Sequence, residues 1–339
     1  MPCGFARISK PLCSARPHVT ETGPESPQHF QFLLVENFSH LAFSCAVEPL
    51  RIANHVAKAE LYRWSFASQD GEFARASNGS ETRVSLSFKD AGRADYVFAL
   101  SGLGVQSATT TSLLAALRRG RAHGARIGAL CSGAYILAEA GLLDQQKAAI
   151  HWDYHDSFME EFPEVGLSRN VFVSDAPVIT ASGGTATADL MLFLIAQSHG
   201  DDLAIEVADQ MVYNAVRDAD AAQRVSLQSR HGIRNEHLTR AIQLMNDSID
   251  DPRPPSVIAR ELGISGRQME RLFGRYLNCS PKKYYVDLRL QKAQRLLVQT
   301  DMSVTEVAFA TGFNSPTHFS KTYRVQFGVS PKDQRTKIE

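Results

Sequence analysis

The chain has 339 residues, 44% of them hydrophobic and 21% charged, and its 36 Lys and Arg balance its 36 Asp and Glu. This composition is ordinary for a soluble globular protein and excludes disordered, collagen-like and coiled-coil classes for most of the chain. No apolar run reaches the roughly 18 residues of a membrane-spanning helix, and the basic N-terminus lacks the apolar core of a secretory signal. The length suggests two domains or one large one, and we expect a cytoplasmic protein without membrane association.

Cysteine usage and charge distribution narrow the class further. The five cysteines lack metal-ligand spacing, which fits a reducing cytoplasm and argues against a disulfide framework or a zinc site. Residues 231–339 contain 17 Lys and Arg against 11 Asp and Glu, so this segment carries +6 and the remainder −6. A basic C-terminal third predicts one part that meets a polyanion, although surface charge also varies between domains without such a role.

The first two thirds of the chain alternate between strand and helix patterns. Residues 1–28, rich in Pro, Ser and Thr, predict a flexible tail. This order predicts an α/β domain at 29–202, with a parallel sheet and helices on both faces. Such sheets bind ligands outside the carboxyl ends of their strands. The predicted strands are 30–35, 64–68, 94–100, 125–130 and 178–181, and the predicted helices are about 43–58, 107–123, 134–140 and 185–198.

The strand pattern almost disappears from about residue 201. Residues 203–228 predict a connecting helix with a polar end, inside a linker at 203–231. A proline-rich break follows at 251–255. Residues 232–339 predict a separate all-α domain.

Two copies of one pattern, about fifty residues apart, make up this all-α domain. In each copy a short helix ends at a glycine, Gly263 or Gly312, which suits a left-handed C-terminal cap. Ser265 or Ser315 then offers an N-cap for a second helix. Apolar side chains at three- and four-residue spacing bury one face of that helix. The pattern predicts a helix-turn-helix motif, present twice.

The exposed faces of the two second helices carry side chains that hydrogen-bond to nucleic acid. Arg pairs with guanine O6 and N7, and cations on helices also contact phosphates. A solvated helix face is the plain alternative for either helix alone, but two such helices in a net-positive segment favour DNA. These side chains are Arg267, Gln268, Glu270, Arg271 and Arg275 on the first helix, and Thr317, His318, Lys321 and Arg324 on the second.

The second copy also carries a dense set of signature residues: Ala308, Gly312, Phe313, Ser315, Phe319, Ser320, Tyr323, Phe327, Gly328, Ser330, Pro331 and Arg335. With them, residues 232–339 resemble the DNA-binding domain of the AraC/XylS family of bacterial transcription regulators. Gln334 departs from the family, which usually has an aromatic residue there. The resemblance implies contacts with double-stranded promoter DNA by Arg267, Glu270 and Arg271 of the first helix, and by Thr317, His318 and Lys321 of the second.

A candidate reactive thiol lies in the α/β domain. Cys131 follows a predicted strand on a tight turn into a helix, the geometry of a nucleophile elbow. Backbone N–H groups at Gly102 and Ser132 would form an anion-binding corner, and His151 would take the thiol proton in catalysis. A lone Cys in an apolar turn is, however, commonly just a small buried residue. His151 and His155 have the spacing of metal ligands on a helix, but no third ligand is evident.

Four features make residues 30–200 resemble the PfpI-type, class I glutamine amidotransferase-like fold: the turn at Cys131, the run 141–144, the pair His151-Trp152 and the turn 180–189. Two positions depart from the catalytic members. Ala42 stands where they have a glutamate, and Ser132 stands where protease-like members have the catalytic histidine. The nearest carboxylate is Glu48, about two turns along the helix. These departures predict that an enzyme fold is retained as a ligand receptor.

Together the two domains make residues 30–339 resemble the GlxA-like subgroup of AraC regulators. The resemblance implies an activator that responds to a small nitrogenous metabolite, such as an amino acid or a quaternary amine. It also implies a homodimer, contact with RNA polymerase, and neither cofactor nor metal. We expect the signal to pass through the 203–230 helix. The alternative is a cysteine-dependent amidase, hydrolase or glyoxalase-like enzyme that also binds DNA.

The expected ligand site is a single crevice where the glycine-rich turns converge. The anionic group of a ligand is expected against the N–H groups near Gly102 and Ser132. A cationic group is expected against the ring of Trp152 or Tyr154, although Trp152 is equally well explained as a core residue. The expected ligand-binding residues are Glu48, Ser101, Gly102, Cys131, Ser132, His151, Trp152 and Gly184.

Overall fold

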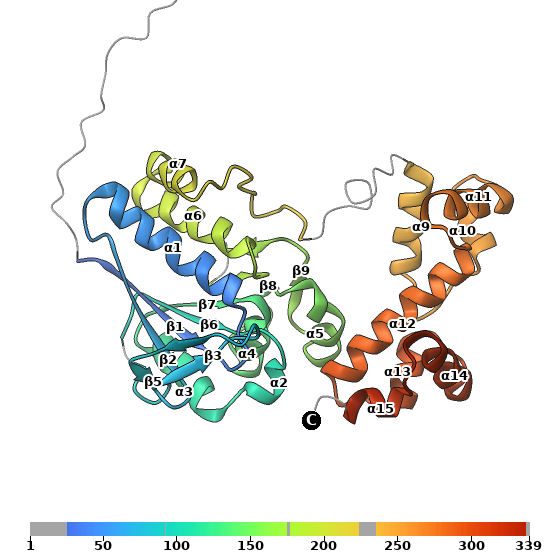
Figure 1. Cartoon of the computed structure of the whole chain (residues 1–339), viewed down its shortest axis with the longest axis horizontal. Coiled ribbons are helices and arrows are strands. Elements are labelled where there is room, and N and C mark those ends of the chain that lie inside the picture. The colour runs from blue at the N-terminus through green and yellow to red at the C-terminus, as the bar shows by residue number, and fades with distance from the viewer. Residues whose placement is uncertain (1–25, 92, 175–176, 224–234, 337–339) are drawn as a thin grey trace, which may run out of the picture.

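The computed structural model describes residues 26–91, 93–174, 177–223 and 235–336, which form an α/β domain and a helical domain (Figure 1). Residues 1–25, most of the predicted flexible tail, lie outside the described residues. The first strand begins at Gln28, two residues before the predicted start.

A seven-stranded sheet forms the centre of the α/β domain, in the order β10-β11-β7-β6-β1-β2-β5. Each neighbouring pair is parallel except β10 with β11. The predicted parallel sheet is therefore confirmed, with two edge strands added that were not predicted, the parallel β5 and the antiparallel β10. The strands are β1 (Gln28–Leu34), β2 (Tyr62–Ser68), β5 (Leu86–Ser87), β6 (Tyr96–Leu100), β7 (Arg126–Leu130), β10 (Phe172–Val173) and β11 (Val178–Ala181).

Two small ribbons lie outside this sheet and were not predicted. In one, β3 (Phe73–Arg75) pairs antiparallel with β4 (Glu81–Arg83), and in the other β8 (Lys147–Ala149) pairs parallel with β9 (Gly166–Ser168). Strands of three residues are too short to show a periodic hydrophobic pattern.

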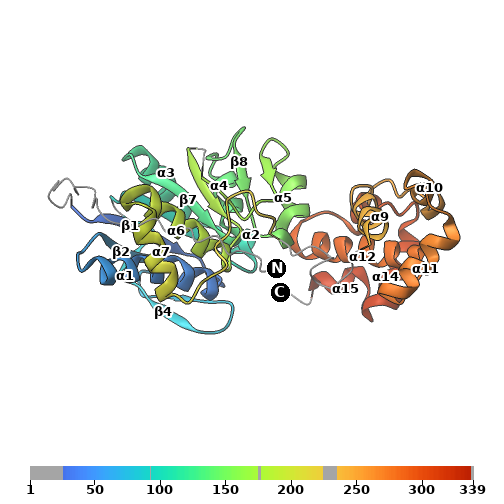
Figure 2. The same ribbon diagram turned by 90° about the horizontal axis from the view of Figure 1, so that it is seen from above.

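Helices cover both faces of the sheet, as predicted (Figures 1 and 2). One face is covered by α1 (His40–Ala57), α6 (Ala186–His199) and α7 (Asp201–Gln210), which pack over stacked rings such as Phe30 and Tyr96, 4.3 Å apart. The other face is covered by α3 (Thr111–Ala122) and α4 (Ala134–Glu139). Because the strands are buried on both sides, they have continuous apolar runs rather than alternation.

The prediction of a single helix at 107–123 is wrong. The structure has a short α2 (Val105–Ala108) and then α3. The Thr110 side chain accepts a hydrogen bond from the Leu113 N–H at 3.4 Å and so caps the start of α3. Thr109 and Thr110 have extended backbone, which suits threonine better than a helix interior does.

The connecting helix predicted at 203–228 is also wrong in its length, because α7 ends at Gln210 and residues 211–223 are not helical. A buried carboxylate accounts for the change of direction. Asp189 of α6 accepts hydrogen bonds from the Tyr213 hydroxyl at 2.9 Å and from Arg217 Nε at 2.9 Å. These contacts draw the segment back onto the α/β domain. Residues 224–231 of the predicted linker lie outside the described residues.

The helical domain has two hydrophobic cores joined by one long helix, α12. Tyr285, in the first half of α12, belongs to the core of the first helix-turn-helix, whereas Leu296 and Leu297 belong to the core of the second. The predicted duplicated helix-turn-helix is confirmed. The helices are α9 (Glu236–Asn246), α10 (Pro255–Glu261), α11 (Gly266–Leu277), α12 (Pro281–Gln299), α13 (Val304–Ala310), α14 (Pro316–Phe327) and α15 (Pro331–Thr336).

The two domains meet at the C-terminal end of α12, which lies against α5 (His155–Glu161) of the α/β domain (Figures 1 and 2). An ion pair between Arg295 and Asp156, at 2.6 Å, joins the two helices. Helices α11 and α14 lie farther from the α/β domain than this end of α12 does.

The two turn glycines of the helical domain provide a matched stability test. Gly263 and Gly312 have φ of 68° and 72°, but a Cβ on Gly312 would lie 2.5 Å from Pro252 Cδ, whereas nothing lies within 4 Å of one on Gly263. We expect Gly263→Ala to cost about 1–2 kcal/mol from backbone strain alone. Gly312→Ala should cost at least about 1 kcal/mol more, because the backbone there must also move. Urea unfolding of the full-length variants measures the difference, and equal losses would contradict this packing.

Candidate functional site

Three turns meet at one edge of the sheet, because β6, β7 and β11 are neighbours and all end there. The turns begin at Ser101, Cys131 and Ser182. Their approach is close: a Cβ on Gly183 would lie 2.6 Å from the Cys131 Cβ. A Cβ on Gly102 would lie 2.2 Å from the Asn37 carbonyl oxygen. The predicted convergence of the turns is therefore present, and it leaves no room for side chains at either glycine.

The backbone at Cys131 is in the left-handed region, with φ 63°. This conformation is uncommon for a residue with a side chain, and it occurs in nucleophile elbows. The residue is nonetheless only 7% exposed. Burial raises the pKa of Cys131 to about 11, and a hydrogen bond from the Ser132 N–H lowers it only in part. At neutral pH the side chain is therefore the neutral thiol.

His151 does not form a hydrogen bond with this thiol among the described residues. Its Nδ1 accepts a hydrogen bond from the Asp153 N–H at 3.3 Å, and the backbone N–H of His151 donates to the Cys131 carbonyl at 3.1 Å. Burial lowers the pKa of His151. Nucleophilic catalysis by a thiol needs a base within reach of the proton, so the described geometry holds no assembled Cys–His pair.

The nearby His155 forms a hydrogen bond with the backbone. Its Nε2 donates to the Ile150 carbonyl at 3.1 Å, and burial lowers the pKa of His155 to about 4. Within the described ranges, no group of three or more His, Cys, Asp or Glu side chains is placed to hold a metal ion.

The Gly102 carbonyl oxygen joins the turns to one another. It accepts a hydrogen bond from Ser132 Oγ at 2.7 Å and a second from the Tyr154 hydroxyl at 2.9 Å. Tyr154 belongs to a 3₁₀ turn, Trp152–Tyr154, and is 5% exposed. Its ring is thus buried rather than offered to a ligand. The sequence gives no signal for this hydroxyl contact, because it joins residues 52 positions apart.

Three more of the expected ligand residues differ widely in position. Ser101 is fully buried, and its Oγ has no hydrogen-bond partner in the part of the chain that is described. Trp152 is half-buried, with its ring 5.4 Å from that of His151. Glu48 lies on the exposed face of α1 and forms an ion pair with Arg51 at 2.7 Å.

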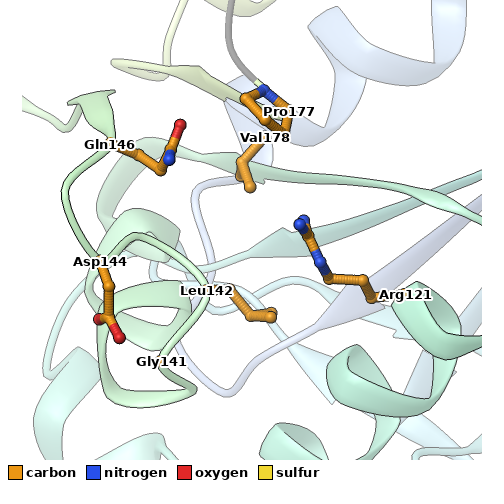
Figure 3. A pocket seen from close by; sticks show the side chains of 7 residues that line it. All are labelled: Arg121, Gly141, Leu142, Asp144, Gln146, Pro177 and Val178. Atoms are coloured by element: carbon orange, nitrogen blue, oxygen red, sulfur yellow. The ribbon is translucent and has the colours of Figure 1, made fainter.

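Two cavities in the α/β domain and beside it lie away from Cys131. One, of about 140 Å³, is at the opposite edge of the sheet, beside the start of β11 (Figure 3). The other, of about 320 Å³, lies between the end of α5 and the segment after α12. Neither of these two cavities lies at the convergent turns, where Cys131 is 7% exposed and Ser101 and Ser132 are fully buried. The residues that line the first cavity are Arg121, Gly141, Leu142, Asp144, Gln146, Pro177 and Val178.

In the helical domain, α11 and α14 each bury one face and expose the other. Ser265 and Ser315 cap them as predicted, accepting from the N–H groups of Gln268 and His318. Beneath the helices lie the buried side chains Met269, Leu272, Phe273, Phe319 and Tyr323. All six residues expected to contact DNA are exposed: Arg267, Glu270, Arg271, Thr317, His318 and Lys321. No helix in the described ranges is long and apolar enough to cross a membrane.

Two family models match the chain, and they divide it as the fold does. The DJ-1/PfpI family model matches residues 29–197, and a helix-turn-helix domain model matches residues 258–337. Among solved structures, an AraC family transcriptional regulator from Pseudomonas putida is 28% identical with a TM-score of 0.50. It covers 55% of this chain and 100% of its own. A ThiJ/PfpI family protein from Pseudomonas syringae, 16% identical with a TM-score of 0.51, covers 82% of this chain and 97% of its own and shares the fold.

Several curated relatives match both domains together. The HTH-type transcriptional regulators GbdR and CdhR of Pseudomonas aeruginosa are each 40% identical to this chain over 91% of its length, and over 84% and 91% of theirs. The HTH-type transcriptional regulator GlxA of Rhizobium meliloti is 35% identical over 91% of this chain and 95% of its own.

The reactivity of Cys131 tests the state of its thiol. We expect iodoacetamide to label Cys131 slowly at pH 7 and about tenfold faster for each pH unit, up to about pH 11, because only the thiolate reacts. Peptide mass spectrometry of the native full-length chain measures the rate, and the urea-unfolded chain is the control. Fast labelling at pH 7 that does not change with pH would mean that the thiol is already ionised.

Proposed function

The chain belongs to the GlxA-like AraC-type transcription regulators, which join a DJ-1/PfpI domain to a helix-turn-helix domain, and on this premise we propose a ligand-responsive transcription activator. Its effector would be a small nitrogenous metabolite, such as an amino acid or a quaternary amine. The observation that carries the proposal is the pair of exposed, N-capped helices α11 and α14 at the two ends of one connecting helix. The regulator would act as a homodimer and contact RNA polymerase at the promoter.

The spacing of the two helices suits successive segments of one DNA face. The 19 residues of α12 make a helix about 28 Å long. One turn of B-DNA separates equivalent major-groove positions by about 34 Å. Placed at the two ends of α12, the exposed faces of α11 and α14 would enter adjacent major-groove segments. Arg271 on α11 and Lys321 on α14 would then reach bases or phosphates.

Two variants test this reading on a DNA site selected in vitro by the purified protein. Replacing Arg271 or Lys321 by Ala should weaken specific binding by about 1–3 kcal/mol, because each removes a cation from the interface. Lys147→Ala, which removes an exposed cation in the α/β domain, is the control and should change nothing. A footprint that covers only one major-groove segment would contradict the proposal, and so would unchanged DNA affinity in both variants.

The α/β domain would bind the effector rather than convert it. Cys131 is a neutral buried thiol with no imidazole hydrogen-bonded to it among the described residues, and Ala42 offers no carboxylate. The fully buried hydroxyl of Ser101 has no partner in the described structure, and such a group normally finds a bond to protein, water or ligand. We propose that the anionic group of the effector bonds to this hydroxyl and to the Gly102 N–H, with Trp152 beside its cationic group.

Other expected residues take a different part in this proposal. Ser132 and Tyr154 hold the Gly102 carbonyl, so they shape the site rather than contact the effector. His151, Cys131 and Gly184 would still line the effector site. Glu48 is left out, because its carboxylate already pairs with Arg51 on the exposed face of α1.

Ser101→Ala tests the effector site without disturbing the fold. A thermal-shift screen of the L-amino acids and glycine betaine identifies a stabilising compound, since a ligand at about 100 times its dissociation constant stabilises by about 2.7 kcal/mol. We expect Ser101→Ala to be at least as stable as the wild type without ligand, because it removes an unpartnered buried hydroxyl. It should bind the compound about 1.5–3 kcal/mol more weakly, the value of a hydrogen bond to a charged group.

Arg121→Ala is the matched control, because Arg121 lines the other cavity of the α/β domain. Titration calorimetry should show unchanged affinity in this variant. Loss of binding in Arg121→Ala with full binding in Ser101→Ala would move the effector site to the cavity of Figure 3 and overturn the assignment.

A further inference from the structure

We propose that the α5–α12 contact is a releasable dock through which the effector site controls the second helix-turn-helix. This proposal rests on the proposed function and adds the route of regulation. The dock consists of Gln106 from α2, Asp156 and Ser157 from α5, and Lys292, Arg295 and Gln299 from α12.

The first part of the dock is a charge pair between the domains. The Asp156 carboxylate accepts from Arg295 Nη2 at 2.6 Å and from Arg295 Nε at 3.1 Å, and Lys292 Nζ lies 3.9 Å away. The side chains of these three residues are only 18%, 26% and 15% exposed. Partial burial leaves the attraction less screened by water and salt than in a surface ion pair. Charge reversal at Asp156 would therefore place three cations together and open the contact.

The second part of the dock caps the C-terminus of α12. A helix leaves its last carbonyl groups without partners in the helix. Gln106 Nε2 donates to the Gln299 carbonyl oxygen at 2.5 Å, so a side chain of the α/β domain satisfies one of them. The hydroxyl of Ser157, a fully buried residue, lies 3.0 Å from Gln299 Oε1 and 3.1 Å from the Tyr154 carbonyl oxygen, and its one proton is shared between these two acceptors. The end of α12 is thus held by directional hydrogen bonds as well as by the ion pair.

Two segments that border the effector site continue into the dock. Gln106 lies in α2, directly after the turn that contains Gly102. Ser157 also hydrogen-bonds to the Tyr154 carbonyl at 3.1 Å, and the Tyr154 hydroxyl binds Gly102. Ser101, Ser132 and Tyr154 are all buried at this site, so an effector that reaches the Ser101 hydroxyl would disturb the Tyr154 contact with Gly102. Movement of Tyr154 then moves the start of α5.

The other side of the dock belongs to the second helix-turn-helix. Leu296 and Leu297 of α12 share a buried core with Phe319 and Tyr323 of α14. Arg335 of α15 donates to the Leu297 carbonyl. Docking of this end therefore fixes the orientation of α14 relative to the α/β domain. The effector would favour the released arrangement, to the extent of its difference in affinity for the two arrangements.

This route differs from the expected one through residues 203–230. The described part of that segment is bound to the α/β domain itself, through Arg217 and Asp189 at 2.7 Å. Backbone bonds from Val171 to Ala221 and from Gln223 to Arg169 hold its end. A segment held in this way moves with the α/β domain, so the dock is the described contact that connects that domain to α12.

Charge reversal with a reciprocal rescue tests the dock in the full-length protein. Asp156→Lys should increase hydrogen exchange in α5 and in the second half of α12. A reporter gene that carries the DNA site selected in vitro measures expression without effector. Asp156→Lys should raise this expression by about fivefold or more, since fivefold is the low end of common allosteric coupling strengths. Asp156→Lys combined with Arg295→Glu restores opposite charges and should return both readouts toward the wild type. Glu164→Lys, the same charge change at an exposed position after α5, should leave both unchanged.

Each result decides for or against the dock. Wild-type exchange and expression in Asp156→Lys would overturn it, as would an equal effect of Glu164→Lys. If Asp156→Lys only inactivates the protein, failure of the double variant to restore activity overturns the proposal, and recovery of effector-dependent expression in the double variant supports it. Binding of the wild-type protein to the selected DNA and to the compound from the thermal screen is measured separately. Failure of the proposed function would therefore be visible on its own.

Discussion

The carbonyl oxygen of Gly102 is the contact on which the arrangement of the α/β domain's functional edge depends. Two hydroxyl groups, from Ser132 and Tyr154, donate to this one acceptor. They bring together the turn after β6, the turn after β7 and the segment that leads into α5. The position of α5, and with it the contact with α12, follows from this buried hydrogen-bond network. Buried networks of this kind specify one arrangement because each unmade bond would leave a desolvated polar group.

The backbone at this edge has the shape of a thiol-dependent active site, but the thiol at its centre, that of Cys131, is neutral. The left-handed backbone at Cys131 has the form of a catalytic elbow. Close packing by Gly183 nonetheless keeps the sulfur from solvent, and burial outweighs the hydrogen bond from the Ser132 N–H. Geometry of the chain and reactivity of the side chain are thus set by different neighbours. A receptor can therefore retain the backbone geometry of the turn without the reactivity of the thiol.

The sequence predicted the alternation of strands and helices, the convergence of the glycine-rich turns and the duplicated helix-turn-helix, because each has a local pattern. Ser265 and Ser315, for example, mark helix starts within a few residues of the groups they cap. The early end of α7 had no such local signal, since it depends on Asp189, more than twenty residues away. The contact of Arg295 with Asp156 joins residues 139 positions apart and belongs to no repeated pattern. Contacts of this kind require the three-dimensional arrangement.

The close approach at Gly312 has a consequence for the DNA sequence itself. The turn of the second motif touches Pro252 and Ile249 of the first, and Arg289 of α12 lies 4.0 Å over the Phe313 ring, so the two motifs are braced against each other. The two motifs are therefore held at a fixed distance from each other and at a fixed rotation about the DNA axis. Each base pair inserted between the two half-sites would rotate one of them by about 34° around the duplex axis. Operators for this protein should therefore tolerate substitutions in the spacer far better than a change in its length.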